Sequence, residues 1–197
     1  MPTPDDGQLW AEAQRGSPDA VGALFDRHAN AIYTYCFRRT GDWALAEDLT
    51  SAVFFELLRS RRGHRLSAEA VRPWLFGIAL NVIRNQARAT RRYRAALERI
   101  PPLEAERDFA DELVERLADE LAMRDILRTI RKLPEPEQDA FTLCAWEGFS
   151  SAEAAEILNV PETTVRTRVF RARQRLRSLG TSQADEELTP ERIRRDA

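Results

Sequence analysis

The sequence predicts an all-α protein made of two small helical domains joined by a flexible linker. Three observations predict this fold: apolar residues recur at helical spacing along most of the 197 residues, no segment alternates as a strand does, and Pro101-Pro102 interrupts the periodic pattern. Hydrophobic residues at 43% and charged residues at 31% are typical of a globular chain.

Three helices are expected before the linker. Ser17, Pro18 and Asp19 supply an N-cap, a proline at the first helical position and an acid in the first turn. The helix that follows is expected to bury Val21, Leu24, Phe25, His28, Ile32 and Tyr35, and Gly41 ends it. After Asp42, a second helix repeats apolar residues at Leu45, Leu49, Val53 and Leu57. Pro73 suits the first position of a third helix, in which we expect Trp74 to be a core residue.

The last third of the chain predicts a helix-turn-helix. A helix from about Asp111 to Lys132 precedes another that starts near Pro136 and ends at Gly148. Residues 150–153 then form a Ser-x-x-Glu capping box, which starts a short helix that ends in a turn at 159–161. A further helix carries Val165, Val169, Ala172 and Leu176 on one face. Two short helices around a tight turn are typical of helix-turn-helix DNA-binding domains.

The near-neutral formal charge of −2 hides two basic blocks. Residues 59–99 hold eleven arginines against two acids, and residues 159–179 hold six arginines against one acid. One basic block is often only a solvated helix face, but two blocks on amphipathic helices favour contact with a polyanion. Lys132 is the single lysine among the 30 basic residues, and arginine is suited to phosphates and guanine edges.

The second helix of the helix-turn-helix carries the first predicted DNA-binding surface. Its candidate residues are Thr164, Arg166, Thr167, Arg168, Phe170, Arg171 and Arg173. Arginine can fork onto guanine in the major groove, and threonine can bond a base edge or touch a thymine methyl group. The alternative is a solvated amphipathic helix packed on its neighbour, and we expect Phe170 to be partly in the core.

The basic block at 59–99 predicts a second surface, suited to a splayed single strand. Asn81, Arg84, Asn85 and Arg88 recur on one helical face, opposite Trp74 and Ile78. A preceding loop brings Arg61, Arg62, His64 and Arg65 near that face, where His64 is expected to be a solvated residue. A basic loop beside asparagine amides, which can read adenine edges, fits an unpaired strand.

An enzymatic role is not predicted. Asp108, Asp111, Glu112 and Glu115 could hold a divalent metal, but an acidic face near a helix start explains them better. The two cysteines, Cys36 and Cys144, are too few for a zinc site or a disulfide framework. No Gly-rich loop, signal peptide or membrane-spanning run is found in the sequence. We expect a cytoplasmic protein with no metal, no cofactor and no membrane insertion.

Three stretches in order resemble the extracytoplasmic-function (ECF) sigma factors of bacterial RNA polymerase. Residues 46–55 resemble the family's acidic-Asp-Leu segment in region 2, and residues 73–88 resemble its Trp-Leu stretch. Residues 133–173 resemble region 4 almost end to end. The resemblance implies region 2 at 8–95, a linker at 96–112, region 4 at 113–179 and a C-terminal tail at 180–197.

The resemblance also implies roles for these surfaces. Region 4 would read the −35 promoter element, and the third helix with its loop would read and open the −10 element. The second helix would dock on core RNA polymerase through Asp48, Leu49, Phe54, Phe55 and Leu58. Phe54 and Leu58 lie off the apolar stripe of that helix, so they are expected at the surface. An anti-sigma factor is an expected further partner.

Three positions depart from the family pattern. Ser51 stands where glutamine is frequent, Asn85 where aspartate is frequent and Leu58 where tryptophan is frequent. The first two affect details of polymerase docking and −10 preference. Two alternatives stay open: a free-standing helix-turn-helix regulator and a metal-dependent nuclease that uses the acids at 108–115.

Overall fold

The computed structural model describes residues 4–60, 63–97 and 127–187, and these residues contain helices and connecting turns but no strand. The chain divides into two compact units, residues 1–121 and residues 122–197. The expected all-α fold with two helical domains is therefore confirmed. The expected linker at 96–112 falls almost wholly outside the described residues. No described helix is both long and apolar enough to cross a bilayer.

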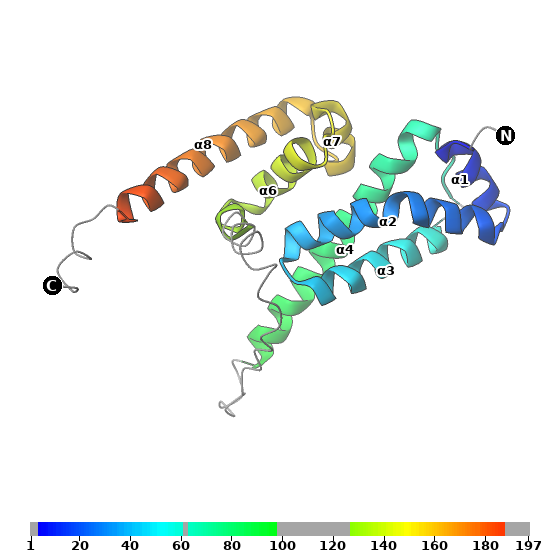
Figure 1. Ribbon diagram of the computed structural model, residues 1–197, viewed down its shortest axis with the longest axis horizontal. Helices are drawn as coiled ribbons and strands as arrows, with labels where there is room; N and C mark the ends of the chain where they lie inside the picture. Colours follow the sequence, from blue (N-terminus) through cyan, green and yellow to red (C-terminus); the bar gives the residue numbers. More distant parts are fainter. Residues whose placement is uncertain (1–3, 61–62, 98–126, 188–197) are drawn as a thin grey trace. The chain divides into compact units, whose positions relative to one another are not determined.

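The N-terminal unit contains α1 (Asp6–Gln14), α2 (Pro18–Thr40), α3 (Trp43–Ser60) and α4 (Ala68–Leu97), as Figure 1 shows. The predicted start of α2 is confirmed, because the Ser17 hydroxyl accepts a hydrogen bond from the N–H of Ala20 and Pro18 follows at the first position. Gly41 ends α2 in the left-handed conformation, with φ of +64°, and its N–H bonds to the carbonyl of Phe37.

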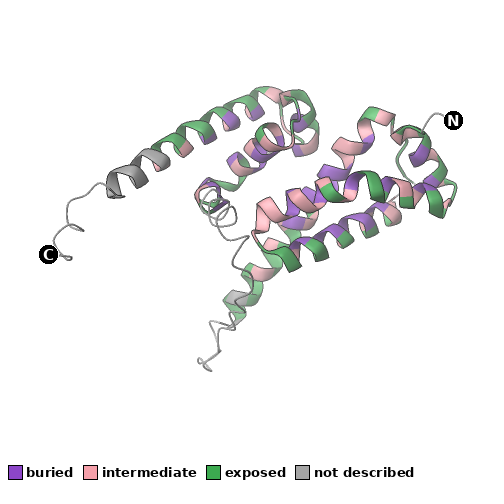
Figure 2. Ribbon diagram, viewed as in Figure 1, coloured by how far each residue is buried: buried purple, intermediate pink, exposed green. Residues whose placement is uncertain are grey.

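The core of this unit lies among its four helices. Each of α2, α3 and α4 turns one apolar stripe inward, as the buried segments in Figure 2 show. Fully buried side chains include Leu24, Ile32, Tyr35, Val53, Leu57, Leu75, Phe76 and Leu80. Tyr35 of α2 packs on Phe76 of α4, with ring centroids 5.2 Å apart.

Two features of this unit differ from the expectation. Helix α1 was not predicted, although Asp5 and Gln8 form a capping box at its start. Helix α4 begins at Ala68 and contains Pro73, instead of beginning at Pro73. The missing N–H of proline removes one i→i−4 hydrogen bond near the helix start, which a helix of 30 residues tolerates.

The C-terminal unit is described from residue 127. A helical segment at 127–131 is followed by α6 (Glu135–Phe141), the π-helical turn η1 (Thr142–Trp146), α7 (Ser151–Leu158) and α8 (Glu162–Glu187). The expected helix from Asp111 to Lys132 lies mostly outside the described residues. The backbone of α8 continues through position 180, where the C-terminal tail was expected to begin.

The helix that was expected to run from Pro136 to Gly148 changes geometry after Phe141. In η1 the N–H of Glu147 bonds to the carbonyl of Thr142, five residues earlier, at 3.1 Å. Gly148 then ends the segment with a positive φ of +73°. Leu143 and Phe149, on either side of this end, are both buried in the core of the unit.

Candidate nucleic-acid interfaces and docking surface

The helix-turn-helix is built by two local signals that the sequence carries. The Ser150 hydroxyl accepts the N–H of Glu153 at 3.2 Å, and the Glu153 carboxylate accepts the N–H of Ser150 at 2.8 Å. This confirms the predicted capping box at the start of α7. Asn159 ends α7 with φ of +51°, a left-handed conformation that asparagine tolerates. The chain can therefore turn sharply into α8.

Helix α8 separates an apolar face from a polar one. Val165, Val169 and Ala172 are buried against the rest of the C-terminal unit. The seven predicted −35 residues all lie on α8: Arg166, Thr167, Phe170, Arg171 and Arg173 are exposed, and Thr164 and Arg168 are half-buried. Phe170 is 61% exposed, so the expectation that it is partly in the core is wrong. An exposed phenylalanine among arginines is available to touch a base or sugar.

Two contacts on α8 affect what its polar face can bind. Arg166 donates to Glu162 at 2.5 Å, an exposed pair of the kind that contributes little to stability and exchanges readily. Arg175 lies 3.1 Å from the buried carboxylate of Glu137 and so links α8 to α6.

Burial raises the pKa of the Cys144 thiol, while the nearby Arg173 guanidinium opposes that shift.

The second basic surface lies on α4 of the N-terminal unit. Asn81, Asn85 and Arg88 are exposed, Arg84 is half-buried, and Ile78 and Ile83 are buried on the other side of the helix. Arg88 donates to the amide oxygen of Asn85 at 3.0 Å and to the carbonyl of Arg84 at 3.3 Å. The exposed Asn81, Asn85 and Arg88 form one solvent-facing strip of α4, along which the side chains of Asn85 and Arg88 are hydrogen-bonded to each other.

The loop that precedes α4 lies beside this helix. His64 and Arg65 are exposed, as expected, while Arg61 and Arg62 lie outside the described residues. Trp74 of α4 is half-buried and packs against the Trp10 ring at 4.9 Å and the His64 ring at 5.3 Å. Trp74 is therefore not a fully buried core residue, since it joins the loop to α1. Trp10 was not among the predicted residues, because the sequence pattern did not predict α1.

The residues of α3 that were predicted to dock on polymerase differ in how far they are buried. Asp48 and Phe55 are exposed, with Phe55 at 68%, and Leu58 is half-buried. Leu49 and Phe54 are buried, at 4% and 7% exposure. The expected surface position of Phe54 is wrong, because the ring packs edge-on against Phe25 of α2 at 4.7 Å.

Two exposed aromatic residues near α3 were missed as surface residues. Phe25 was expected on the buried face of α2, yet it is 45% exposed and packs against Phe54. Trp43, at the start of α3, is 50% exposed and stacks on Phe37 with ring centroids 3.7 Å apart. Phe25 of α2 and Phe55 of α3 are thus exposed phenylalanines on neighbouring helices.

The acids of the alternative nuclease site, at 108–115, lie outside the described residues. Among the residues that are described, no group of three or more His, Cys, Asp or Glu side chains could hold a metal ion.

The family model described as Sigma-70 region 2 matches residues 24–93, and the model described as Sigma-70, region 4 matches residues 123–176. The first match lies on the N-terminal unit and covers α3, most of α2 and α4 up to Tyr93. The second lies on the C-terminal unit and includes the helix-turn-helix.

Curated relatives match along most of the chain. The ECF RNA polymerase sigma-E factor of Haemophilus influenzae is 33% identical over 177 residues, which cover 86% of this chain and 92% of that protein. The RNA polymerase sigma-H factor of Pseudomonas aeruginosa is 31% identical over 185 residues, with 86% and 90% covered. The ECF RNA polymerase sigma factor BldN of Streptomyces coelicolor is 31% identical over 168 residues, which cover 84% of this chain and 62% of BldN.

Two solved structures share the fold. CnrH, in complex with the cytosolic domain of CnrY, has a TM-score of 0.68 at 23% identity, with 90% of this chain and 97% of that chain covered. The sigma factor RpoE of Bartonella quintana, in complex with the anti-sigma factor NepR, has a TM-score of 0.64 at 21% identity, with 81% and 96% covered. These two likenesses agree with the fold, and the two family matches and the relative that is 33% identical show that this chain belongs to the ECF sigma factors of RNA polymerase.

Proposed function

We propose that this chain binds core RNA polymerase, directs it to promoters by reading −35 and −10 elements, and promotes transcription initiation. The observation that carries this proposal is the presence of two exposed basic surfaces on two separate units of one chain. A free-standing helix-turn-helix regulator needs only the surface on α8 and leaves the strip on α4 without a role. We assign the −10 and docking functions to residues 8–95, the −35 function to residues 113–179 and the connection to residues 96–112.

The −35 element is read by the polar face of α8. Arg171 and Arg168 are the candidates for guanine edges, since residues three positions apart share one face of a helix. Phe170 adds an apolar contact, and Arg166 reaches phosphate after exchanging its exposed pair with Glu162.

The −10 element is read by the strip on α4 and by the loop before it. Asn81 and Asn85 provide amides for base edges, while Arg88 and Arg65 provide charge for the backbone of an unpaired strand. Neither surface requires a chemical step, so we propose an initiation factor without an active site of its own.

Docking on core polymerase uses exposed and half-buried residues of α2 and α3. We keep Asp48, Phe55 and Leu58 from the predicted set and add Phe25. Leu49 and Phe54 are buried beneath this surface. Because CnrH and RpoE were solved with CnrY and with the anti-sigma factor NepR, we propose that an anti-sigma factor also binds this chain. The site of action is the cytoplasm, where promoter DNA and core polymerase are found.

The decisive experiment is run-off transcription with purified core polymerase on a library of randomised promoters, with and without this chain. We expect transcripts that require both components and that share two sequence elements. Transcripts that share only the upstream element would contradict the proposal. Transcripts that core polymerase makes equally well without this chain would also contradict it.

A selected promoter then tests the role of α8. Arg171→Ala should weaken binding to the −35 duplex by about 1–3 kcal/mol and mainly for the selected sequence. Arg15→Ala, which removes the same charge from an exposed position in the N-terminal unit, is the matched control and should leave binding unchanged. Equal loss on all duplexes would instead identify Arg171 as a phosphate contact.

A further inference from the structure

Helix α1 contacts the loop that precedes α4. The loop residues Gly63, His64, Arg65 and Ser67 are exposed. Within the loop, the N–H of Gly63 bonds to the carbonyl of Ser60, and the N–H of Ala70 bonds to the carbonyl of Ser67. These bonds lie at the two ends of the loop.

The middle of the loop is secured by two donors on α1. The indole N–H of Trp10 donates to the carbonyl of His64 at 2.8 Å, and the side-chain amide of Gln14 donates to the same oxygen at 2.7 Å. Residues 10 and 14 are one helical turn apart, so both donors leave the same face of α1. Two donors on one carbonyl fix both its position and its direction.

Ring contacts reinforce these hydrogen bonds. Trp10 is 1% exposed and packs edge-on against Trp74, which also lies 5.3 Å from the His64 ring. The loop, α1 and α4 thus meet in one aromatic cluster made of Trp10, His64 and Trp74.

Gly7 brings α1 against the far end of the same loop. A Cβ atom at this position would lie 2.9 Å from the backbone nitrogen of Ala68 and 3.3 Å from its Cα. Backbone atoms cannot move aside as a flexible side chain does, so glycine is required for this close approach. Helix α1 therefore contacts the loop at its middle and at its junction with α4.

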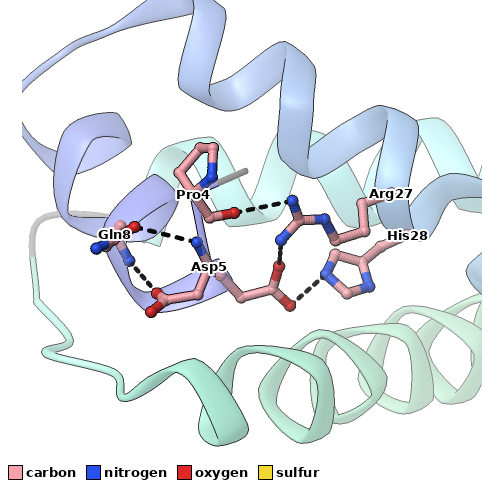
Figure 3. Close-up of polar contacts among 6 residues, drawn as sticks. Pro4, Asp5, Gln8, Arg27 and His28 are labelled. Atoms are coloured by element: carbon pink, nitrogen blue, oxygen red, sulfur yellow. Dashed lines mark hydrogen bonds and ion pairs between the residues drawn. The ribbon is translucent and has the colours of Figure 1, made fainter. Parts of the chain in front are cut away.

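Helix α1 is itself held by α2, as Figure 3 shows. Asp6 accepts hydrogen bonds from Arg27 and from Nε2 of the buried His28, the latter at 2.8 Å. Arg27 also donates to the carbonyl of Pro4 at 3.0 Å. Because α2 is packed in the core of the unit, these bonds give α1 a rigid base.

We propose that Trp10 and Gln14 are positioning residues that hold the −10-reading loop in the shape required for an unpaired strand. The proposal rests on the proposed function, since it assumes that this loop contacts the −10 element. A loop that is ordered in advance loses less conformational entropy when it captures a flipped base. Residues 6–14 precede the stretch at 24–93 that the region 2 model matches.

The test compares variants of the full chain on one promoter selected in the run-off experiment above. Gln14→Met keeps the length of the side chain and removes its donors, and Trp10→Phe keeps an aromatic ring and removes the indole N–H. Each should lower run-off transcription from a closed duplex by about two- to tenfold, as expected for the loss of one hydrogen bond. A template mismatched over the −10 region should recover much of this loss, because unpairing is then no longer needed.

Two further variants separate positioning from a merely structural role. Gln14→Lys restores a donor and should recover most of the closed-duplex activity. Glu12→Met places the same new side chain on an exposed position of α1 and should behave like the parent. Core-polymerase binding and −35 duplex binding should stay at the parent values for Gln14→Met, and the midpoint of thermal unfolding should fall by only the few degrees that one hydrogen bond contributes.

The outcomes decide the proposal. Parent-like activity of both Gln14→Met and Trp10→Phe on the closed duplex would overturn it. Equal loss on closed and mismatched templates, without recovery by Gln14→Lys, would also overturn it and leave α1 a structural support. If the parent chain itself gives no transcript with core polymerase on either template, the proposed function has failed instead.

Discussion

Phe54 and Phe55 are neighbours in the sequence but lie in different environments. Successive residues on a helix are turned by about 100°, so one ring of such a pair can enter the core while the other faces solvent. Phe54 is 7% exposed and packs on Phe25, whereas Phe55 is 68% exposed. Of two identical side chains one position apart, Phe54 therefore contributes to the core and Phe55 is left accessible to a partner.

Phe54→Ala should lower the free energy of unfolding by about 3 kcal/mol, because it removes a buried ring and leaves a cavity. Phe55→Ala should change it by less than about 0.5 kcal/mol, as is usual for an exposed position. Core-polymerase affinity, measured by surface plasmon resonance, should fall for Phe55→Ala. A docking surface that excludes Phe55 would be indicated if affinity were unchanged in that variant.

The two cysteines should also differ in reactivity. Burial raises the pKa of the Cys36 thiol to about 12, only partly offset by its hydrogen bond with Thr50. Cys144 is half-buried and its pKa is raised less. Since the thiolate is the reactive form, at pH 8 we expect iodoacetamide to modify Cys144 at least about tenfold faster than Cys36. Mass spectrometry of tryptic peptides measures this ratio, and adding denaturant should abolish it.

The raised pKa of Cys36 also makes the stability of the fold depend on pH. An unfolded chain releases the Cys36 proton near pH 9, whereas the folded chain keeps it until about pH 12. The unfolded state therefore binds fewer protons between these values, and the Cys36 contribution to stability falls as the pH rises through that window.

At the scale of elements, the capping box before α7 was predictable and α1 was not. Ser150 and Glu153 precede an apolar run that ends in an asparagine turn, so three local signals agree. Asp5 and Gln8 are also a capping box, but the helix that they start is held by contacts with distant residues such as Arg27 and His64. Those contacts leave no periodic pattern in the sequence.

The candidate surfaces also contain a part that the sequence predicted and a part that it did not. The polar face of α8 and the strip on α4 could be predicted, because helical spacing alone determines which side chains share a face. The burial of Phe54 and the exposure of Phe25 could not, because both depend on how α2 and α3 are turned toward each other.

Ser150→Ala should destabilise the C-terminal unit by about 1 kcal/mol, since the N–H of Glu153 loses its acceptor. The adjacent Ser151→Ala is the matched control and should change stability by less than about 0.5 kcal/mol, because Ser151 is inside the helix. Urea unfolding followed by far-UV circular dichroism measures both. Equal effects of the two substitutions would show that the cap does not stabilise α7.

At the scale of the molecule, the charge is divided between two units. The basic strip on α4 belongs to residues 1–121 and the basic face of α8 to residues 122–197. Each unit has its own buried core in the described residues, so each has the means to fold alone.

Residues 1–112 and 113–197, expressed separately, should both be helical by far-UV circular dichroism. The shorter fragment should bind the −35 duplex of a selected promoter within about threefold of the affinity of the whole chain, because α8 and its support lie within it. Core-polymerase binding should remain with the longer fragment. An unstructured C-terminal fragment would contradict the independence of the two units.

The π-helical turn η1 amounts to one additional residue in a helix that would otherwise run on regularly. An α-helix turns by about 100° for every residue, so shortening Thr142–Trp146 by one position would swing Gly148 and Phe149 around the helix axis by that amount. Phe149, which is 3% exposed, would leave the core, and the chain would enter α7 from a different direction. The number of residues in η1 thus sets the direction of α7 and α8 relative to α6. Insertions and deletions in this turn would allow relatives of this chain to vary that direction.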